Sequence, residues 1–352
     1  MDKNIVWLDY AKVLGIFLVI FGHCLQRFPC WQEVYFVKSL WDYIYLFHMP
    51  LFFAISGYLF KNNVVNIQNV KHGWGKILKT ILIPYLLYQF LFFPFALYSS
   101  HGFTDISIWE KLLCGILMGD GYETLFSHYV CLPCWFIICI FHLRLFFLVV
   151  PINKYTSVFI TIFCIWFLII RKHYDFDLYF CLDNTIMAIP YFLGGYYCGN
   201  KKILDRYNNT FLLIVLCIIS AIAIWIILNI NGAAQMIAPT YGKNLLINYM
   251  AGALGTLGIW SLSKMLANCF RNKNFIHTIS RNTLFIIFFH WLLLMFIGKM
   301  IHKTFGDICT NAVSIIVVSL LLSLIILFFS KIVIDFGVIK YPFLFGKLRT
   351  KK

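Results

Sequence analysis

Long apolar stretches alternate with short polar segments along almost the whole chain of 352 residues. A helix crosses the core of a bilayer with about 20 mostly apolar residues, and a window of that length finds about ten such stretches here. Their approximate limits are Ile5–Leu25, Leu40–Phe60, Ile77–Tyr98, Tyr129–Val150, Tyr155–Ile170, Asn184–Gly199, Phe211–Leu228, Leu245–Met265, Thr283–Ile301 and Ala312–Ile334. The pattern therefore predicts an all-α polytopic membrane helix bundle of about ten transmembrane helices.

The segments between these stretches are too short to form a water-soluble domain. The longest connection, 99–128, contains the apolar piece Lys111–Met118, which has the length of an interfacial helix. After the last apolar stretch the chain is short and basic. We therefore expect one membrane domain over residues 1–335 and a basic cytoplasmic tail over residues 336–352.

The composition excludes a soluble enzyme. The chain is 61% hydrophobic and only 12% charged, whereas soluble domains are about 45–50% apolar and about 25% charged. The net charge of +15 is also typical of nucleic-acid binders, but here the basic residues flank apolar stretches. If the stretches alternate in direction from a cytoplasmic N-terminus, most lysines and arginines fall in the inner segments. The positive-inside rule then places both termini in the cytoplasm, in a multi-pass protein of the cell membrane without a nucleic-acid partner.

The first stretch carries an unusual stripe of polar residues. Asp9 and Lys12 are three residues apart, and Lys12 and His23 are eleven apart, so all three project from one face of a helix. Lys12 and His23 are then about 16 Å apart along the axis. Asp or Lys at a helix centre costs on the order of 2.5–3.5 kcal/mol on insertion. A snorkelling lysine and a structural histidine would account for single residues, but the stripe as a whole favours a function.

Two further histidines lie within apolar stretches. His48 is in the second stretch, followed by Pro50, where we expect the helix to break just after the histidine beside a cavity. In an antiparallel pair of helices, His48 and His23 would approach each other in the outer half of the membrane. Asp42 sits near the same mouth. His290 is at mid-depth in the ninth stretch, and its isolated position favours a structural role.

Neutral imidazole takes and returns a proton near neutral pH. A cavity lined by histidines, with a cation deeper on the cytoplasmic side, suits transfer of a group across the membrane. It suits proton-coupled transport equally well, and periodicity and charge do not choose between them.

The chain has 12 cysteines, most of them in or near apolar stretches, where thiols pack as small hydrophobic groups. Cys131 and Cys134 form a CxxC pair. A redox role is one interpretation, but no thioredoxin-like strand and helix pattern accompanies the pair, so packing is favoured. No second cysteine pair or suitably spaced histidine follows, and we expect no metal site.

Several segments resemble the acyltransferase-3 family of integral membrane O-acyltransferases. Lys12-x10-His23 is similar to the family's (Arg/Lys)-x10-His signature, and WLDYAK, GHCL and FHMPLFFAISGYLF look like its fucose 4-O-acetylase-type branch. KILKTILIPYLLY, LPCWFIICIF, IPYFLGGYYCG and ISRNTLFIIFFH follow in the family's order. Each segment is weak alone, but their order and spacing together are fairly specific.

The resemblance implies ten spans and transfer of an acyl group, usually acetyl, from cytoplasmic acyl-CoA to a sugar hydroxyl of a surface or lipid-linked glycan. His23 would be the essential histidine and Lys12 its basic partner, held by Asp9; His48 joins these catalytic candidates because of its expected position beside His23, not through the resemblance. Lys12 would stabilise either the thioester oxygen or the donor's phosphates. The basic residues with which CoA phosphates would pair are Lys76, Lys79 and Arg281, although each is also explained by the positive-inside rule.

The chain departs from the family pattern at two points. Position 12 is Lys where Arg is commoner, which keeps the charge but loses the bidentate fork. No esterase-like soluble domain follows the last stretch, so we expect the membrane part to finish the transfer itself or to hand the group to a separate protein. Transfer of succinyl or another acyl group, and a proton-coupled transporter or flippase, remain as alternatives. Transporters often contain internal repeats and paired broken helices, and neither is evident in this sequence.

Overall fold

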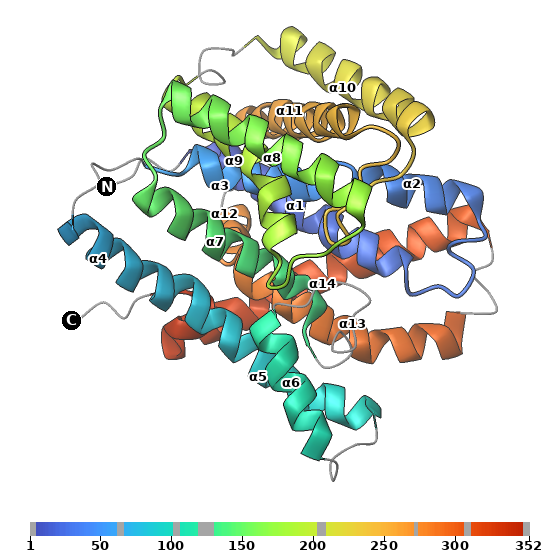
Figure 1. Cartoon of the computed structure of the whole chain (residues 1–352). Coiled ribbons are helices and arrows are strands. Elements are labelled where there is room, and N and C mark those ends of the chain that lie inside the picture. The colour runs from blue at the N-terminus through green and yellow to red at the C-terminus, as the bar shows by residue number, and fades with distance from the viewer. Residues whose placement is uncertain are drawn as a thin grey trace.

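A computed structural model describes residues 5–61, 67–100, 106–118, 130–202, 209–270, 274–305 and 311–347, and within these ranges the chain is helical without a β-strand. The prediction of an all-α bundle is therefore confirmed (Figure 1). The helices are α1 (Val6–Leu25), α2 (Tyr35–Tyr45), α3 (His48–Tyr58), α4 (Ile67–Ile77), the π-helical η1 (Leu78–Leu82), α5 (Ile83–Ser100), α6 (Ile106–Met118), the 3-10 helix η3 (Leu132–Cys134), α7 (Trp135–Val149), α8 (Lys154–Tyr174), α9 (Leu182–Asn200), α10 (Thr210–Asn231), α11 (Leu245–Cys269), α12 (Asn274–Ser280), α13 (Thr283–Phe305), α14 (Ala312–Lys340) and the 3-10 helix η5 (Pro342–Phe345).

Within the described ranges, seven helices are long and apolar enough to cross a membrane, or eight if α12 and α13 form one span bent by 84°. The sequence pattern predicts about ten. The two other predicted stretches are helical but differ from simple apolar spans. Leu40–Phe60 is divided between α2 and α3, and Asn184–Gly199 lies within α9, which carries many polar and small residues.

The break in the second stretch lies before His48. Helix α2 ends at Tyr45, Phe47 has a non-helical backbone, and α3 begins at His48. The predicted break after His48 is therefore wrong in position. Pro50 is in the first turn of α3, where a helix needs no backbone N–H donor, so proline is tolerated there. Across the break, the Nδ1–H of His48 donates to the carbonyl oxygen of Ile44 at 3.0 Å.

Two glycines allow α3 and α9 to pack with their backbones in contact. A Cβ atom on Gly57 would lie 1.9 Å from the carbonyl oxygen of Phe192, and one on Gly195 would lie 1.9 Å from that of Ala54. Small residues at a helix crossing are the usual way in which membrane helices approach closely. This contact explains why α9 is inside the bundle although it is less apolar than its neighbours.

The helices divide into a central group and a peripheral group. Helix α1 is central, with 67% of its apolar window buried, whereas only 17% of the α8 window and 22% of the α10 window are buried. Figure 1 shows α10 outside α11. Its residues Ile218, Ile222 and Ile226 repeat every fourth position and are exposed. Such apolar faces suit contact with lipid.

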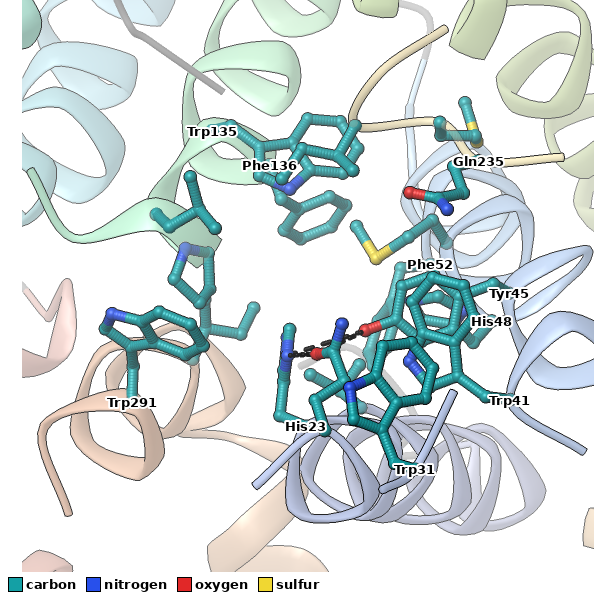
Figure 2. A pocket seen from close by; sticks show the side chains of 18 of the residues that line it. His23, Trp31, Trp41, Tyr45, His48, Phe52, Trp135, Phe136, Gln235 and Trp291 are labelled. Carbon is teal, nitrogen blue, oxygen red and sulfur yellow. Dashed lines mark hydrogen bonds between the residues drawn. The ribbon is translucent and has the colours of Figure 1, made fainter. Parts of the chain in front are cut away.

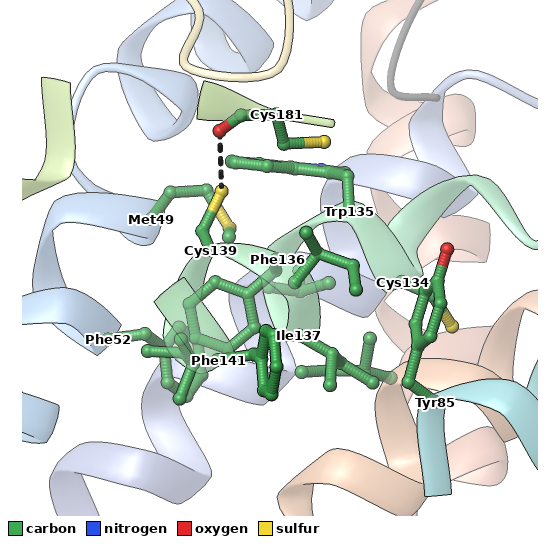
Figure 3. Packing of buried hydrophobic residues seen from close by; sticks show 14 of the residues in the cluster. Met49, Phe52, Tyr85, Cys134, Trp135, Phe136, Ile137, Cys139, Phe141 and Cys181 are labelled. Carbon is green, nitrogen blue, oxygen red and sulfur yellow. Dashed lines mark hydrogen bonds between the residues drawn. The ribbon is translucent and has the colours of Figure 1, made fainter. Parts of the chain in front are cut away.

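An aromatic core surrounds the start of α7 (Figure 3). The ring of Phe136 lies 5.7 Å from that of Phe52 and 5.0 Å from that of Phe53, between ring centroids. Cys131 and Cys134 are buried free thiols at the edge of this core. Their surroundings are those that the packing interpretation of the CxxC pair predicts.

The last helix extends past the boundary expected at residue 335. Helix α14 continues to Lys340, and η5 then turns back against the bundle, where the Phe345 ring lies 4.5 Å from that of Phe285. The described part of the expected tail, up to residue 347, therefore packs against the membrane helices. Its last residues, 348–352, lie outside the described ranges.

Candidate active site

Two cavities follow one another along α7 and α13. The histidine cavity, of about 210 Å³, is lined by Val19, His23, Gln26, Trp31, Gln32, Lys38, Trp41, Tyr45, His48, Met49, Phe52, Leu132, Pro133, Trp135, Phe136, Gln235, Met236, Ile237, Ile287 and Trp291. The basic cavity, of about 710 Å³, is lined by Leu59, Phe60, Lys61, Asn69, His72, Gly73, Lys76, Ile77, Thr80, Ile81, Ile140, Arg144, Phe147, Leu148, Arg281, Leu284, Phe345, Gly346 and Lys347.

Only about one helical turn separates the two cavities. On α7, Phe136 lines the histidine cavity and Ile140 lines the basic cavity. On α13, Ile287 lines the histidine cavity and Leu284 the basic cavity. Residues four positions apart on a helix are separated by about 6 Å along the axis. The partition between the cavities is therefore a thin layer of apolar side chains.

His23 projects from the last turn of α1 into the histidine cavity (Figure 2). Its Nδ1 lies 2.9 Å from Oε1 of Gln26. An amide oxygen only accepts hydrogen bonds, so Nδ1 carries the proton and Nε2 keeps a free lone pair. The hydroxyl of Tyr45 is 3.4 Å from the same Nδ1. Gln26 thus favours the tautomer in which Nε2 of His23 is the nitrogen able to accept a proton.

His48 lines the same cavity, as the antiparallel arrangement of the first two stretches predicts. The Tyr45 ring lies between the two histidines, 4.5 Å from the ring of His48 and 6.3 Å from that of His23. The Nδ1–H of His48 is bound to the main chain. Its Nε2 is therefore the free lone pair, as for His23.

His290 stands beside His23. The two imidazoles stack with centroids 5.5 Å apart and planes 27° apart. His290 is fully buried, and its Nδ1–H donates to the carbonyl oxygen of Ile286 at 2.7 Å. Its Nε2 has no hydrogen-bond partner among the described residues. Its isolated position in the sequence favours a structural role, which leaves out the stacking on His23. The available signal was a third histidine within an apolar stretch.

The rest of the histidine cavity is aromatic and almost neutral. Trp31, Trp41, Trp135 and Trp291 line it, and the last of these contacts the His23 ring at 5.1 Å. Among the described lining residues the single charged side chain, Lys38, is paired with Asp42 on the same helix (Figure 2 shows the surrounding rings). The carboxylate of Asp42 therefore acts as the counter-ion of Lys38 at the mouth of the cavity.

A fixed loop, residues 232–244, closes one side of the histidine cavity and presents Gln235 to it. The amide of Asn184 donates to the carbonyl oxygens of Met236 and Ile237, at 2.5 and 2.8 Å. Arg171 donates to the hydroxyl of Tyr241 at 3.3 Å. Burial raises the pKa of Tyr241 above its usual value, so the hydroxyl stays neutral. The sequence pattern gave no indication of this loop.

Asp9 does not hold Lys12 by a direct hydrogen bond. Its carboxylate accepts from Nδ1 of His277 at 3.1 Å and from the hydroxyl of Ser280, which fastens α1 to α12. Lys12 is within electrostatic reach of Asp9, Arg144 and Arg281. Lys12 is thus on the side of the basic cavity, away from His23.

The predicted CoA residues are divided between two neighbouring surfaces. Lys76 and Arg281 line the basic cavity, whereas Lys79 lines an adjoining groove with Lys71, His72, Gly75 and Lys76. Sequence reasoning missed Arg144, which it counted only toward the topology. Arg144 donates from Nη2 to the Ser56 hydroxyl and carbonyl oxygens, at 3.3 and 3.4 Å.

The basic cavity has no acidic side chain in its described lining, although five lysines and arginines line it, namely Lys61, Lys76, Arg144, Arg281 and Lys347. Lys76, Arg144, Arg281 and Lys347 form no ion pair with a described carboxylate. Unpaired cations that share a cavity repel one another and favour an anionic ligand. Among the described residues there is no cluster of metal ligands.

The described residues thus place an imidazole cavity next to a cavity lined by several cations, which favours an anionic ligand in the second cavity. The comparison with protein families defines the class further. The Acyltransferase domain model of the acyltransferase-3 family matches residues 5–330. The chain belongs to this family, as the resemblance of its segments predicts.

Two curated relatives share a shorter region with the chain. The nodulation protein NolL of Mesorhizobium japonicum is 38% identical over 82 residues, covering 23% of this chain and 21% of that protein. The nodulation protein NolL of Sinorhizobium fredii is 35% identical over 86 residues, covering 23% of this chain and 22% of that protein. The matches thus span about a fifth of each relative. No solved structure matches the chain.

Proposed function

We propose that this protein is a multi-pass O-acyltransferase of the cell membrane. It moves an acyl group, acetyl in the first instance, from acyl-CoA to a sugar hydroxyl of a surface or lipid-linked glycan. The observation that carries the proposal is the pair of adjacent cavities, one cationic and one with a poised imidazole, separated by a single turn of α7 and α13.

The basic cavity suits the donor. CoA carries several phosphate charges at one end and a thioester at the end of a long arm. Lys76, Arg144 and Arg281 supply the matching positive charge, and an arginine forms bidentate bonds with phosphate. The arm would pass between Phe136 and Ile140 of α7 to bring the thioester into the histidine cavity.

The histidine cavity suits a neutral polyhydroxyl acceptor. Aromatic rings provide flat apolar faces, and a few amide groups provide hydrogen bonds, which is the usual composition of a small-molecule site. Here Trp135 and Trp291 supply rings while Gln26 and Gln235 supply amides. The one charge among the described lining residues, on Lys38, is compensated by Asp42, which suits a neutral sugar.

The reaction follows from the tautomer of His23. Its Nε2 accepts the proton of the sugar hydroxyl, and the hydroxyl oxygen attacks the thioester carbonyl carbon. The carbon–sulfur bond breaks as the new ester forms, and the proton passes from His23 to the departing CoA sulfur. Tyr45 and His48 are the neighbouring polar groups positioned to hold the acceptor.

Lys12 then acts on the donor's phosphate-bearing part. The eleven residues between Lys12 and His23 separate them by about 16 Å along α1. Side chains on a helix tilt toward its N-terminus. The Lys12 side chain therefore points away from His23, and so away from the thioester, which must lie close to His23. Of the two roles that the resemblance implies for Lys12, its position beside Arg144 and Arg281 favours the phosphates over the thioester oxygen.

Glycan analysis by mass spectrometry and NMR of cells expressing the wild type, His23→Ala or Lys12→Ala tests the function. We expect an O-acyl group that both variants lose. His142→Ala is the matched control, because His142 also lies in a membrane helix but lines neither cavity. Unchanged acylation at normal membrane levels of His23→Ala would refute the proposal. Solute or glycolipid movement without acyl-CoA would favour a transporter instead.

A further inference from the structure

The end of the described chain folds back onto the basic cavity. The C-terminal turn, residues 342–347, follows α14 and is fastened by two contacts. The hydroxyl of Tyr88 donates to the carbonyl oxygen of Leu344, and the buried ring of Phe345 packs against Phe285. The turn is thus part of the folded bundle and forms one wall of the cavity.

Gly346 sets how closely the turn approaches the π-helical segment η1. Its φ is +64°, and a Cβ atom there would lie 2.7 Å from the carbonyl oxygen of Thr80. A side chain is therefore opposed both by the backbone conformation and by the contact. This close approach brings the next residue, Lys347, to the rim of the cavity that Lys76 also lines.

Lys347 is a cation without a described counter-ion. Its backbone N–H is bound to the carbonyl oxygen of Pro342 at 3.0 Å, and its side chain is half-buried beside Arg281. Burial and the Arg281 guanidinium both lower the pKa of Lys347 below its usual value. Two adjacent cations that are partly removed from water are stabilised when an anion binds between them.

We propose that Lys347 is a ligand of the donor's phosphate groups and that the C-terminal turn completes the donor site. This inference rests on the proposed function, since it takes acyl-CoA to be the anion. The segment that looks like a solvated basic tail in the sequence then includes a binding element. Lys347 would bind the phosphates together with Arg281, Lys76 and Arg144, which line the same cavity.

Calorimetric titration of CoA into the purified full-length protein in detergent tests the inference. Lys347→Gln removes a charge-assisted bond of about 1.5–3 kcal/mol, so the Kd should rise roughly tenfold to a hundredfold. Lys347→Arg should retain most of the affinity. The matched control is Lys340→Gln, because Lys340 is an exposed cation over the Tyr341 ring and lies outside the cavity lining. Pantetheine, which has no phosphates, should not distinguish the variants.

Two further measurements cover a variant that does not fold. In the wild type, CoA should slow acetylation of the Lys347 amine by a water-soluble reagent and leave that of Lys340 unchanged. Gly346→Ala should weaken CoA binding although every cation is retained. Equal affinity in the wild type and Lys347→Gln, or equal labelling of Lys347 with and without CoA, overturns the inference. If Lys76→Gln weakens binding and Lys347→Gln does not, the donor assignment stands without Lys347. If the wild type binds no CoA, both the donor assignment and the role of Lys347 are overturned.

Discussion

The histidine cavity and the basic cavity share α7 and α13 in their walls but differ in their electrostatics. In the first, the imidazoles are in fixed tautomers and the charge of Lys38 is compensated. In the second, four lysines and arginines have no described carboxylate partner. A buried cation is expensive without a counter-charge, whereas a neutral imidazole is not. Under the proposed function, the contrast teaches that donor binding and chemistry belong to different cavities, one charged and one neutral.

The largest effect is expected from removing the base. His23→Ala should lower kcat by about 10²- to 10⁴-fold, the usual contribution of a general base. The Kd of CoA should stay near that of the wild type, because His23 is about 16 Å along α1 from Lys12. Steady-state kinetics and calorimetry on the same preparation measure the two quantities. If His23→Ala weakened CoA binding as much as it lowered kcat, donor binding and chemistry would not be separated between the two cavities.

A smaller effect, on donor binding rather than on kcat, is expected in the basic cavity. Arg144→Gln should raise the Kd of CoA roughly tenfold to a hundredfold, because one charge-assisted phosphate bond is lost. At saturating donor, kcat should be nearly unchanged. Lys331→Gln is the control, because Lys331 is paired with Asp335 and lines neither cavity. If Arg144→Gln lowers kcat and does not change the Kd of CoA, Arg144 takes part in the chemical step. The basic cavity would then not be only a binding site.

The smallest effect is expected at His290, and it sharpens the comparison at the ring of His23, on which His290 stacks. His290→Phe keeps a flat ring against His23 and removes the buried Nε2 that has no described partner. Removing an unsatisfied polar atom should stabilise the protein by roughly 1–3 kcal/mol. We nevertheless expect kcat to fall about tenfold, because Nε2 of His290 would help to transfer the proton that His23 accepts. Thermal unfolding measures the change in stability, and steady-state kinetics measures the change in kcat. A stabilised variant with unchanged kcat would show that His290 only packs.

The sequence was sufficient for the fold class and for the relation between His23 and His48. Apolar periodicity identifies membrane helices because each must span the same thickness of hydrocarbon. The periodicity of one helix also places Lys12 and His23 on one face. It does not locate a break, because proline is equally acceptable in the first turn of a new helix, where Pro50 stands.

The missed residues depend on contacts between distant segments. Arg144 was taken as a topology signal, since a basic residue near a span end has the same appearance whether it faces solvent or a cavity. Gln235 comes from a loop whose position depends on Asn184 and Arg171, which are more than fifty residues away in the chain. Lys347 reaches the basic cavity only because Gly346 lies against Thr80. Such tertiary contacts leave no periodic trace in the sequence.

The most direct test of the central claim is photolabelling with two acyl-CoA analogues. One carries an azide on the adenine, and the other carries a diazirine on the acyl group. We predict that the adenine analogue labels peptides of the basic cavity, around Lys76 or Arg281, and that the acyl analogue labels peptides of the histidine cavity, around Trp135 or Trp291. Labelling of one cavity by both analogues, or of neither cavity, would contradict a donor that spans the two.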